Sequence, residues 1–129
     1  VMIIPVHGQC LCGGVLFSTE SESLWCAHCH CTLCQIAHGA AFVTWVGYKV
    51  DSVQIQGTDL TWFKSSDEGE RGFCRECGTT LFFRSSQWPA QLHIARGLIQ
   101  DDIDRLPEGH AFYDTHVNWV STDDDLPTT

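Results

Sequence analysis

The sequence predicts a single domain that is mainly β, and three observations support this fold class. The chain has 129 residues, which suits one hydrophobic core, so we expect residues 1–129 to form one zinc-binding domain rather than two units. Its hydrophobic fraction of 43% and aromatic fraction of 11% are those of a globular protein. Its apolar segments are short, are rich in β-branched and aromatic residues, and are separated by glycine, proline and polar residues, as in a β protein.

Six segments are expected to form strands. In chain order they are residues 15–18, 40–46, 49–56, 60–64, 79–84 and 91–96. The second segment is an apolar run too short for a typical helix, and the third places Val53 and Ile55 between polar residues, which is typical of a half-buried strand. Residues 65–69 are polar and are expected to form a loop. Residues 32–38 are expected to form one short helix that ends at Gly39.

The chain is acidic, with a formal net charge of -9 at pH 7. This charge repels polyanions, so we expect no nucleic-acid partner and no binding to a membrane surface. No apolar run approaches the roughly 20 residues needed to span a bilayer. Residues 1–6 are apolar, but they have no basic lead and no small-residue cleavage pattern, so they do not resemble a signal peptide. We expect a cytoplasmic protein whose oligomeric state the sequence does not reveal.

Eight cysteines carry the strongest functional signal, because most of them lie in CxC, CxCxxC and CxxC clusters. The groups are Cys10 and Cys12, then Cys26, Cys29, Cys31 and Cys34, and finally Cys74 and Cys77. A secreted disulfide scaffold is the alternative interpretation, but it requires an oxidising compartment and leaves the clustering unexplained. Short turns of this kind direct neighbouring sulfur atoms at one metal ion, and zinc is the metal that such sites usually hold.

Two tight turns predict a closed zinc site. Residues 74–78 read Cys-Arg-Glu-Cys-Gly, the form of a zinc knuckle, in which the glycine adopts a positive φ and turns N–H groups toward sulfur. Residues 10–14 read Cys-Leu-Cys-Gly-Gly and follow the same logic. The four ligands of this structural site are Cys10, Cys12, Cys74 and Cys77. A set of buried reduced cysteines is the alternative.

A second, compact set consists of Cys29, Cys31 and Cys34. Three thiolates can hold one face of a tetrahedral Zn²⁺ and leave a position open, which is the mark of a catalytic site. Because three thiolates donate much charge, such a zinc is a weak Lewis acid. It is better suited to holding an incoming thiol as a nucleophilic thiolate than to making hydroxide.

Cys26 and the neighbouring histidines leave this second site partly open to interpretation. Cys26 could complete a four-sulfur site with Cys29, or it could be a small buried hydrophobe beside Trp25. We expect the other three cysteines to hold the metal without it. His28, His30 and His38 lie close by, and each could be a ligand, a proton shuttle or simply a well-paired histidine. We select His30 as the candidate catalytic histidine.

Four stretches together resemble a known family. They are residues 8–15, residues 28–34 leading to Gly39, residues 71–79, and residues 110–114 with Trp119 and Pro127. In this order they resemble the glutathione-dependent formaldehyde-activating enzymes, from about residue 8 to residue 127. The resemblance implies an Mss4-like fold of several small coiled antiparallel sheets with short helical turns, stapled by zinc. It implies two Zn²⁺ per chain, structural and catalytic, at the two cysteine sets already described.

The resemblance also implies a function. The chain would be a zinc-dependent carbon–sulfur lyase or synthase that adds a small-molecule thiol such as glutathione to formaldehyde or a related aldehyde. His30, His110 or His116 would protonate the new alkoxide, and Arg84 or Arg96 could hold a substrate carboxylate. The alternative is a non-catalytic zinc scaffold that binds a protein partner. An open metal position in a cleft would distinguish the enzyme from the scaffold.

Overall fold

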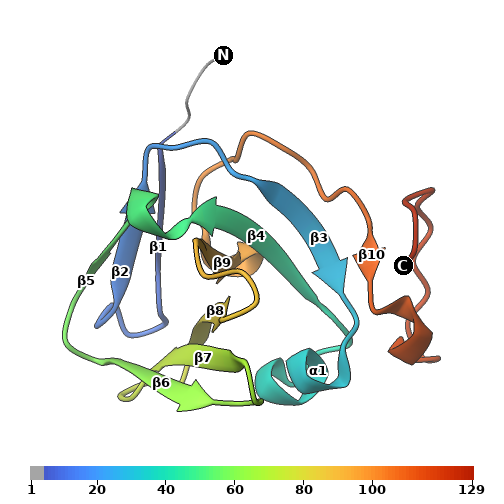
Figure 1. Cartoon of the computed structure of the whole chain (residues 1–129), viewed down its shortest axis with the longest axis horizontal. Helices are drawn as coiled ribbons and strands as arrows, with labels where there is room; N and C mark the ends of the chain where they lie inside the picture. The colour runs from blue at the N-terminus through green and yellow to red at the C-terminus, as the bar shows by residue number, and fades with distance from the viewer. Residues whose placement is uncertain (1–4) are drawn as a thin grey trace.

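The computed structural model describes residues 5–129, so most of the apolar stretch at residues 1–6 lies outside it (Figure 1). Within these residues one helix, α1 (Thr32–His38), accompanies ten strands and three 3₁₀ turns. The strands are β1 (Val6–Gln9), β2 (Leu16–Thr19), β3 (Trp25–Cys29), β4 (Val43–Lys49), β5 (Val53–Gln56), β6 (Leu60–Lys64), β7 (Gly69–Cys74), β8 (Thr80–Ser85), β9 (Gln91–Ala95) and β10 (His110–Ala111). The turns are η1 (Val50–Ser52), η2 (Arg96–Leu98) and η3 (Tyr113–Thr115). The prediction of a mainly β fold is confirmed.

The strands form a three-stranded sheet, β1-β2-β5, and a seven-stranded sheet, β10-β3-β4-β9-β8-β7-β6. Every neighbouring pair is antiparallel except β10 and β3, which run parallel, so the expectation of antiparallel pairing fails at this one edge. Figure 1 shows β10 lying beside β3 and the C-terminal segment lying on the other side of β10, although β3 and β10 are far apart in sequence. In residues 5–129, no helix is long and apolar enough to cross a membrane.

The two faces of the seven-stranded sheet have different environments, because successive side chains on a strand point to opposite faces. One face packs against the three-stranded sheet and forms the main core; Phe82 meets Phe17 of β2 there, with ring centroids 5.4 Å apart. The other face carries a smaller cluster of Cys34, Val43, Trp45 and Ala95, in which α1 contributes Cys34. This second face carries the candidate site.

Some elements follow the sequence pattern closely and others do not. The expected helix at residues 32–38 is α1, and it ends at Gly39 in the left-handed conformation, with φ 60°. The expected strand at residues 40–46 begins only at Val43, and residues 50–52 form a 3₁₀ turn. Four strands were not expected: β1, β3, β7 and β10. In β3 and β7, cysteine, histidine, glycine and charged residues hide the strand pattern. β3 and β7 nevertheless carry much of the candidate site.

Candidate metal centres

Four cysteine sulfurs from two distant turns meet at one point, which we call the four-sulfur set. The sulfurs of Cys10, Cys12, Cys74 and Cys77 all lie within 4.8 Å of one another. Cys12 Sγ is 3.7 Å from Cys10 Sγ and 3.7 Å from Cys74 Sγ. Tetrahedral Zn²⁺ with Zn–S bonds of about 2.3 Å holds its sulfurs roughly 3.8 Å apart, so the donor set fits this ion.

Backbone groups hold the four-sulfur set in place. The N–H groups of Gly14 and Val15 donate to the sulfurs of Cys12 (3.4 Å) and Cys10 (3.3 Å). Gly78 has φ 79°, which a glycine adopts without strain, and its N–H donates to the carbonyl of Cys74 at 2.8 Å. The two N–H···S bonds of the first turn offset thiolate charge. The Gly78 N–H closes the second turn on a carbonyl and not on a sulfur, which differs from the expectation for the zinc knuckle.

Thr79 connects the two turns of the four-sulfur set. Its hydroxyl oxygen accepts a hydrogen bond from Leu11 N–H at 3.0 Å and lies 3.3 Å from Cys77 Sγ. Hydrogen bonds from the Thr79 hydroxyl and backbone N–H lower the pKa of Cys77 to about 5. The turn therefore favours a thiolate at this position.

The second group, which we call the three-sulfur set, forms where β3 meets α1. Cys29 ends β3, Cys31 is the residue that caps α1, and Cys34 lies in the first turn of the helix. Their sulfurs lie within 4.8 Å of one another, and Cys34 Sγ is 3.6 Å from Cys29 Sγ. Among residues 5–129, no fourth metal-binding side chain joins this group. The geometry fits three of the four positions of a tetrahedral zinc ion.

A buried arginine lies directly against the three-sulfur set. Arg71 on β7 is 6% exposed, its Nη2 lies 3.6 Å from Cys34 Sγ, and its guanidinium lies over the Phe83 ring at 5.1 Å. Its Nε and Nη1 are buried and have no hydrogen-bond partner in the part of the chain that the structure describes. A buried cation in contact with sulfur requires a negative charge nearby, and the thiolates supply it.

Contact with the Cys29 sulfur lowers the pKa of Cys34 to about 5, and the Trp45 and Arg71 side chains add to this effect, although burial opposes it. The same contact and burial raise the pKa of Cys29. Sequence analysis assigned no role to Arg71, although it begins the stretch of residues 71–79 that carries the family resemblance. Only the pairing of β7 brings it to the cysteines.

Cys26 lies on the other side of β3 from the three-sulfur set. Positions 26 and 29 are an odd number of residues apart, so their side chains point to opposite faces of the strand. Cys26 is 1% exposed and packs in the main core with residues such as Val46 and Tyr48. It belongs to neither group of converging sulfurs.

His30, our candidate catalytic histidine, also points away from the three sulfurs. Its Nε2 lies 2.8 Å from Nδ1 of His110, and His110 Nε2 lies 2.9 Å from a carboxylate oxygen of Asp124. The ring of His116 is 6.3 Å from that of His30. The three histidines expected to donate a proton therefore gather near one another, on the side of β3 that faces away from Cys29.

The three-sulfur set opens into a cavity of about 600 Å³, which we call the thiolate cleft. The residues that shape it include Trp25, Cys29, Cys31, Leu33, Cys34, Trp45, Arg71, Phe83, Trp88, Gln91, His93 and Phe112. The three sulfurs thus lie in a cleft, as the enzyme interpretation requires; the expected distinguishing feature was an open metal position there. His30, Arg84 and Arg96 do not line this cleft.

One continuous row of paired residues forms the floor of the thiolate cleft. Trp25 pairs with Gly47, Gly47 with His93, His93 with Phe83, and Phe83 with Arg71. A Cβ atom at Gly47 would lie 2.3 Å from the Trp25 indole nitrogen. Glycine at this position therefore allows the indole to lie against the sheet.

Gln91 and His93 are the polar groups on this floor that sequence analysis missed. Gln91 Oε1 accepts a hydrogen bond from the Trp25 indole N–H at 3.1 Å and lies 2.9 Å from His93 Nε2. Since Oε1 can only accept, His93 Nε2 carries the proton. Burial lowers the pKa of His93 to about 4, so the ring is neutral at neutral pH. No sequence motif marks His93 as a site residue: it lies within a strand, and its contact with Trp88 exists only in the folded chain.

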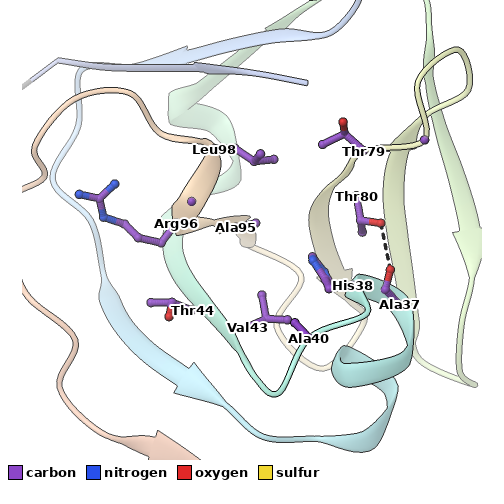
Figure 2. Close-up of a pocket in the computed structure, with 12 residues that line it drawn as sticks. Ala37, His38, Ala40, Val43, Thr44, Thr79, Thr80, Ala95, Arg96 and Leu98 are labelled. Atoms are coloured by element: carbon purple, nitrogen blue, oxygen red, sulfur yellow. Dashed lines mark hydrogen bonds between the residues drawn. The ribbon is translucent and has the colours of Figure 1, made fainter. Parts of the chain in front are cut away.

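The two arginines that we expected to bind a substrate carboxylate are engaged elsewhere. Arg84 pairs with Glu70 at 2.9 Å and stacks over Trp62 at 3.7 Å. Arg96 donates to the carbonyl of Ile99 at 3.2 Å and lines a second cavity of about 650 Å³ (Figure 2). Figure 2 shows that this cavity is bordered by α1, through Ala37 and His38, and no cysteine of the described chain lines it.

The fold and the two cysteine sets define a mainly β protein with two candidate metal centres of unequal closure. The sequence profile of the glutathione-dependent formaldehyde-activating enzyme family matches residues 5–115, which is most of the chain. The chain belongs to this family, and the resemblance inferred from its motifs is confirmed.

Individual relatives agree with this assignment. The chain is 27% identical over 124 residues to a Halomonas elongata protein named "Putative glutathione-dependent formaldehyde-activating enzyme", a match that spans 89% of this chain and 79% of the relative. It is 33% identical over 77 residues to a Schizosaccharomyces pombe protein named as an uncharacterized lyase, over 60% of this chain and 56% of that protein. A crystal structure of a Rhodobacter sphaeroides protein shares the fold, with a TM-score of 0.63, 19% identity and coverage of 95% of this chain and 99% of the other.

Proposed function

We propose that this chain, acting as one zinc-binding domain, is a zinc-dependent carbon–sulfur lyase or synthase. It adds a thiol such as glutathione to formaldehyde or a related aldehyde, and in the reverse direction it cleaves the adduct. One observation carries the proposal: the three-sulfur set lines a cleft large enough for a small molecule. The family membership and the relative named as a lyase support it.

In this proposal Cys29, Cys31 and Cys34 hold the catalytic ion, and the four-sulfur set holds a structural one. A Zn²⁺ ion in the three-sulfur set supplies a position at which a thiol loses its proton readily and remains nucleophilic. The three thiolate charges exceed the charge of the ion by one, and the Arg71 guanidinium beside Cys34 balances that excess. A further thiolate can then enter the cleft without building up a large negative charge.

The reaction that these residues would support balances without a redox partner. The thiol sulfur attacks the carbonyl carbon, a carbon–sulfur bond forms, the carbonyl π bond opens, and its oxygen takes up the proton that the thiol lost. We assign delivery of that proton to water, because the cleft opens to solvent and His30 points to the other side of β3. The walls of the cleft orient the two reactants, which is a large part of catalysis for a bimolecular addition.

The test is to load the protein with cobalt and titrate it with small thiols. Thiolate-to-cobalt charge-transfer absorption should increase when a thiol enters the three-sulfur set, and adduct formation from a thiol and formaldehyde should accelerate. Cys34→Ala should lose both responses, whereas Cys26→Ala should keep them. A wild-type spectrum that no thiol changes would contradict the enzyme and favour the zinc scaffold that binds a protein partner.

A further inference from the structure

The thiolate cleft provides almost no charge for a charged substrate. Among residues 5–129, Arg71 is the one residue with a formal charge that lines it, apart from the cysteines. That guanidinium already contacts Cys34 and Phe83, and its Nε and Nη1 are enclosed by protein. Glutathione carries two carboxylates and an ammonium group, and each of them loses free energy if it leaves water without a charged partner.

The neutral polar side chains that line the cleft supply no charge to compensate for this, and they include Ser66 and Gln87. Gln91 Oε1 already receives hydrogen bonds from Trp25 and His93, and burial keeps the His93 ring uncharged at neutral pH. Gln35 and Ile36, which follow the last cysteine of the three-sulfur set, add no cation: the Gln35 amide donates to the carbonyl groups of His30 and Thr115. The cleft therefore lacks the charged groups that would bind the carboxylates and the ammonium group of glutathione through ion pairs.

The apolar walls are, by contrast, unusually exposed. Leu33, Trp88 and Phe112 are 44%, 45% and 57% exposed, and all three line the thiolate cleft. They come from α1, from the turn between β8 and β9, and from the segment after β10, so three separate parts of the chain contribute. Large apolar side chains that gather at one cavity mark a ligand-binding site rather than random surface exposure.

The backbone at Phe112 gives independent support. Its φ is 55°, and it is the one non-glycine residue among residues 5–129 with a positive φ. This conformation is strained for a residue with a side chain, and such strain is concentrated at functional sites. Phe112 thus lines the cleft in a strained backbone conformation, with more than half of its surface exposed to solvent.

From these observations we infer that the thiolate cleft selects a thiol whose tail is aromatic or large and apolar, in preference to glutathione. This inference rests on the function proposed above and specifies its substrate class. The sulfur of the substrate would lie at the three-sulfur set, and its tail would lie along the floor formed by Trp25, His93 and Phe83, beside Trp88, whose own ring packs against His93. Aromatic side chains favour an aromatic tail, because stacked and edge-on ring contacts add to the burial of apolar surface.

The experiment compares three thiols on the cobalt-loaded full chain at pH 7.5: 2-phenylethanethiol, glutathione and 2-mercaptoethanol. Affinity is measured by charge-transfer absorption and, independently, by shifts of the tryptophan indole N–H signals in NMR spectra of the zinc-loaded protein. We expect 2-phenylethanethiol to bind at least tenfold more tightly than glutathione. Trp88→Ala should reduce this preference severalfold. The matched control Trp119→Ala, at an exposed tryptophan that does not line the cleft, should leave the preference unchanged.

Each other outcome has a definite meaning. If glutathione binds as tightly as 2-phenylethanethiol, or if Trp119→Ala changes the preference as much as Trp88→Ala, the inference is wrong while the proposed function stands. If none of the three thiols alters the cobalt spectrum, the proposed function fails and the inference fails with it. Indole shifts confined to Trp119 would also overturn the inference.

Discussion

The two cysteine sets use the same ligand chemistry but differ in what surrounds the sulfur atoms. The four-sulfur set joins the turn after β1 to the turn at the end of β7, so it offers a sulfur for each position of a tetrahedral ion and links segments more than sixty residues apart. The three-sulfur set lies within six residues, links only β3 to α1, and has a cavity where a fourth ligand would be. The comparison teaches that two features would separate a structural metal site from a reactive one: the number of sulfurs and the span of chain that they join.

Charge compensation differs in the same way. Around the four-sulfur set, backbone N–H groups of Gly14 and Val15 and the Thr79 side chain face the sulfurs. Around the three-sulfur set, the buried guanidinium of Arg71 provides a full positive charge next to Cys34. Partial charges suffice for a site that never changes its ligands, whereas a full charge suits a site that must accept another anion.

The largest expected effect is on folding. Cys77→Ser removes a ligand of the four-sulfur set, and metal binding by structural zinc sites is worth an apparent value of roughly 10–16 kcal/mol in zinc-finger peptides. We expect this variant to lose its cooperative thermal transition, whereas Cys31→Ser should keep one and lose thiol binding. Thermal unfolding by circular dichroism is the measurement. An equal loss of melting temperature in both variants would contradict the division between a structural and a reactive set.

The second-largest expected effect is a difference between the two sets in the rate at which they lose zinc. We expect two zinc ions per chain, and a mild chelator should remove the ion of the three-sulfur set at least tenfold faster, because it has fewer ligands and lies at an open cavity. Zinc release can be followed with a colorimetric indicator while circular dichroism monitors the fold. The Cys34→Ala variant should show only the slow phase. Release of both ions in a single phase that coincides with unfolding would argue against unequal sites.

Arg71 offers a smaller and sharper test of charge balance. In Arg71→Met the apparent pKa for thiol binding to the cobalt-loaded protein should rise by about one unit, since one unit corresponds to roughly 1.4 kcal/mol of interaction with a nearby charge. The gain in charge-transfer absorption should therefore move to higher pH. Arg71→Lys, which keeps the charge but not the planar group, should shift the profile less. Identical pH profiles in wild type and Arg71→Met would show that this guanidinium does not act on the thiol.

The smallest effect concerns Cys26. Because its side chain fills core space behind β3, Cys26→Ala should cost about 1 kcal/mol of stability through the lost packing. It should retain two zinc ions and the full cobalt response to thiols. The measurement is metal content together with the cobalt spectrum of the purified variant. A spectrum weaker by one sulfur would mean that Cys26 reaches the metal after all.

Local features of the fold were accessible from the sequence, because they depend on a few adjacent residues. The helix at residues 32–38 and its end at Gly39 follow from short-range helix signals, and the strand at residues 60–64 from a short apolar segment. β3 and β7 were missed, since their residues serve the site as well as the strand and no longer show the apolar pattern of a strand. The cysteine clusters were recognised because sulfurs two or three residues apart are brought together by any tight turn.

What the sequence by itself determined is therefore the mainly β class, the family and the grouping of the cysteines. Only the tertiary structure decided which other residues meet them. It turned Cys26 and His30 to the far side of β3, brought Arg71 against Cys34, and built the aromatic cleft from strands β3, β4, β8 and β9. The physical reason is that the face on which a strand residue lies depends on strand register and alternation, and these are set by pairing between segments far apart in the chain.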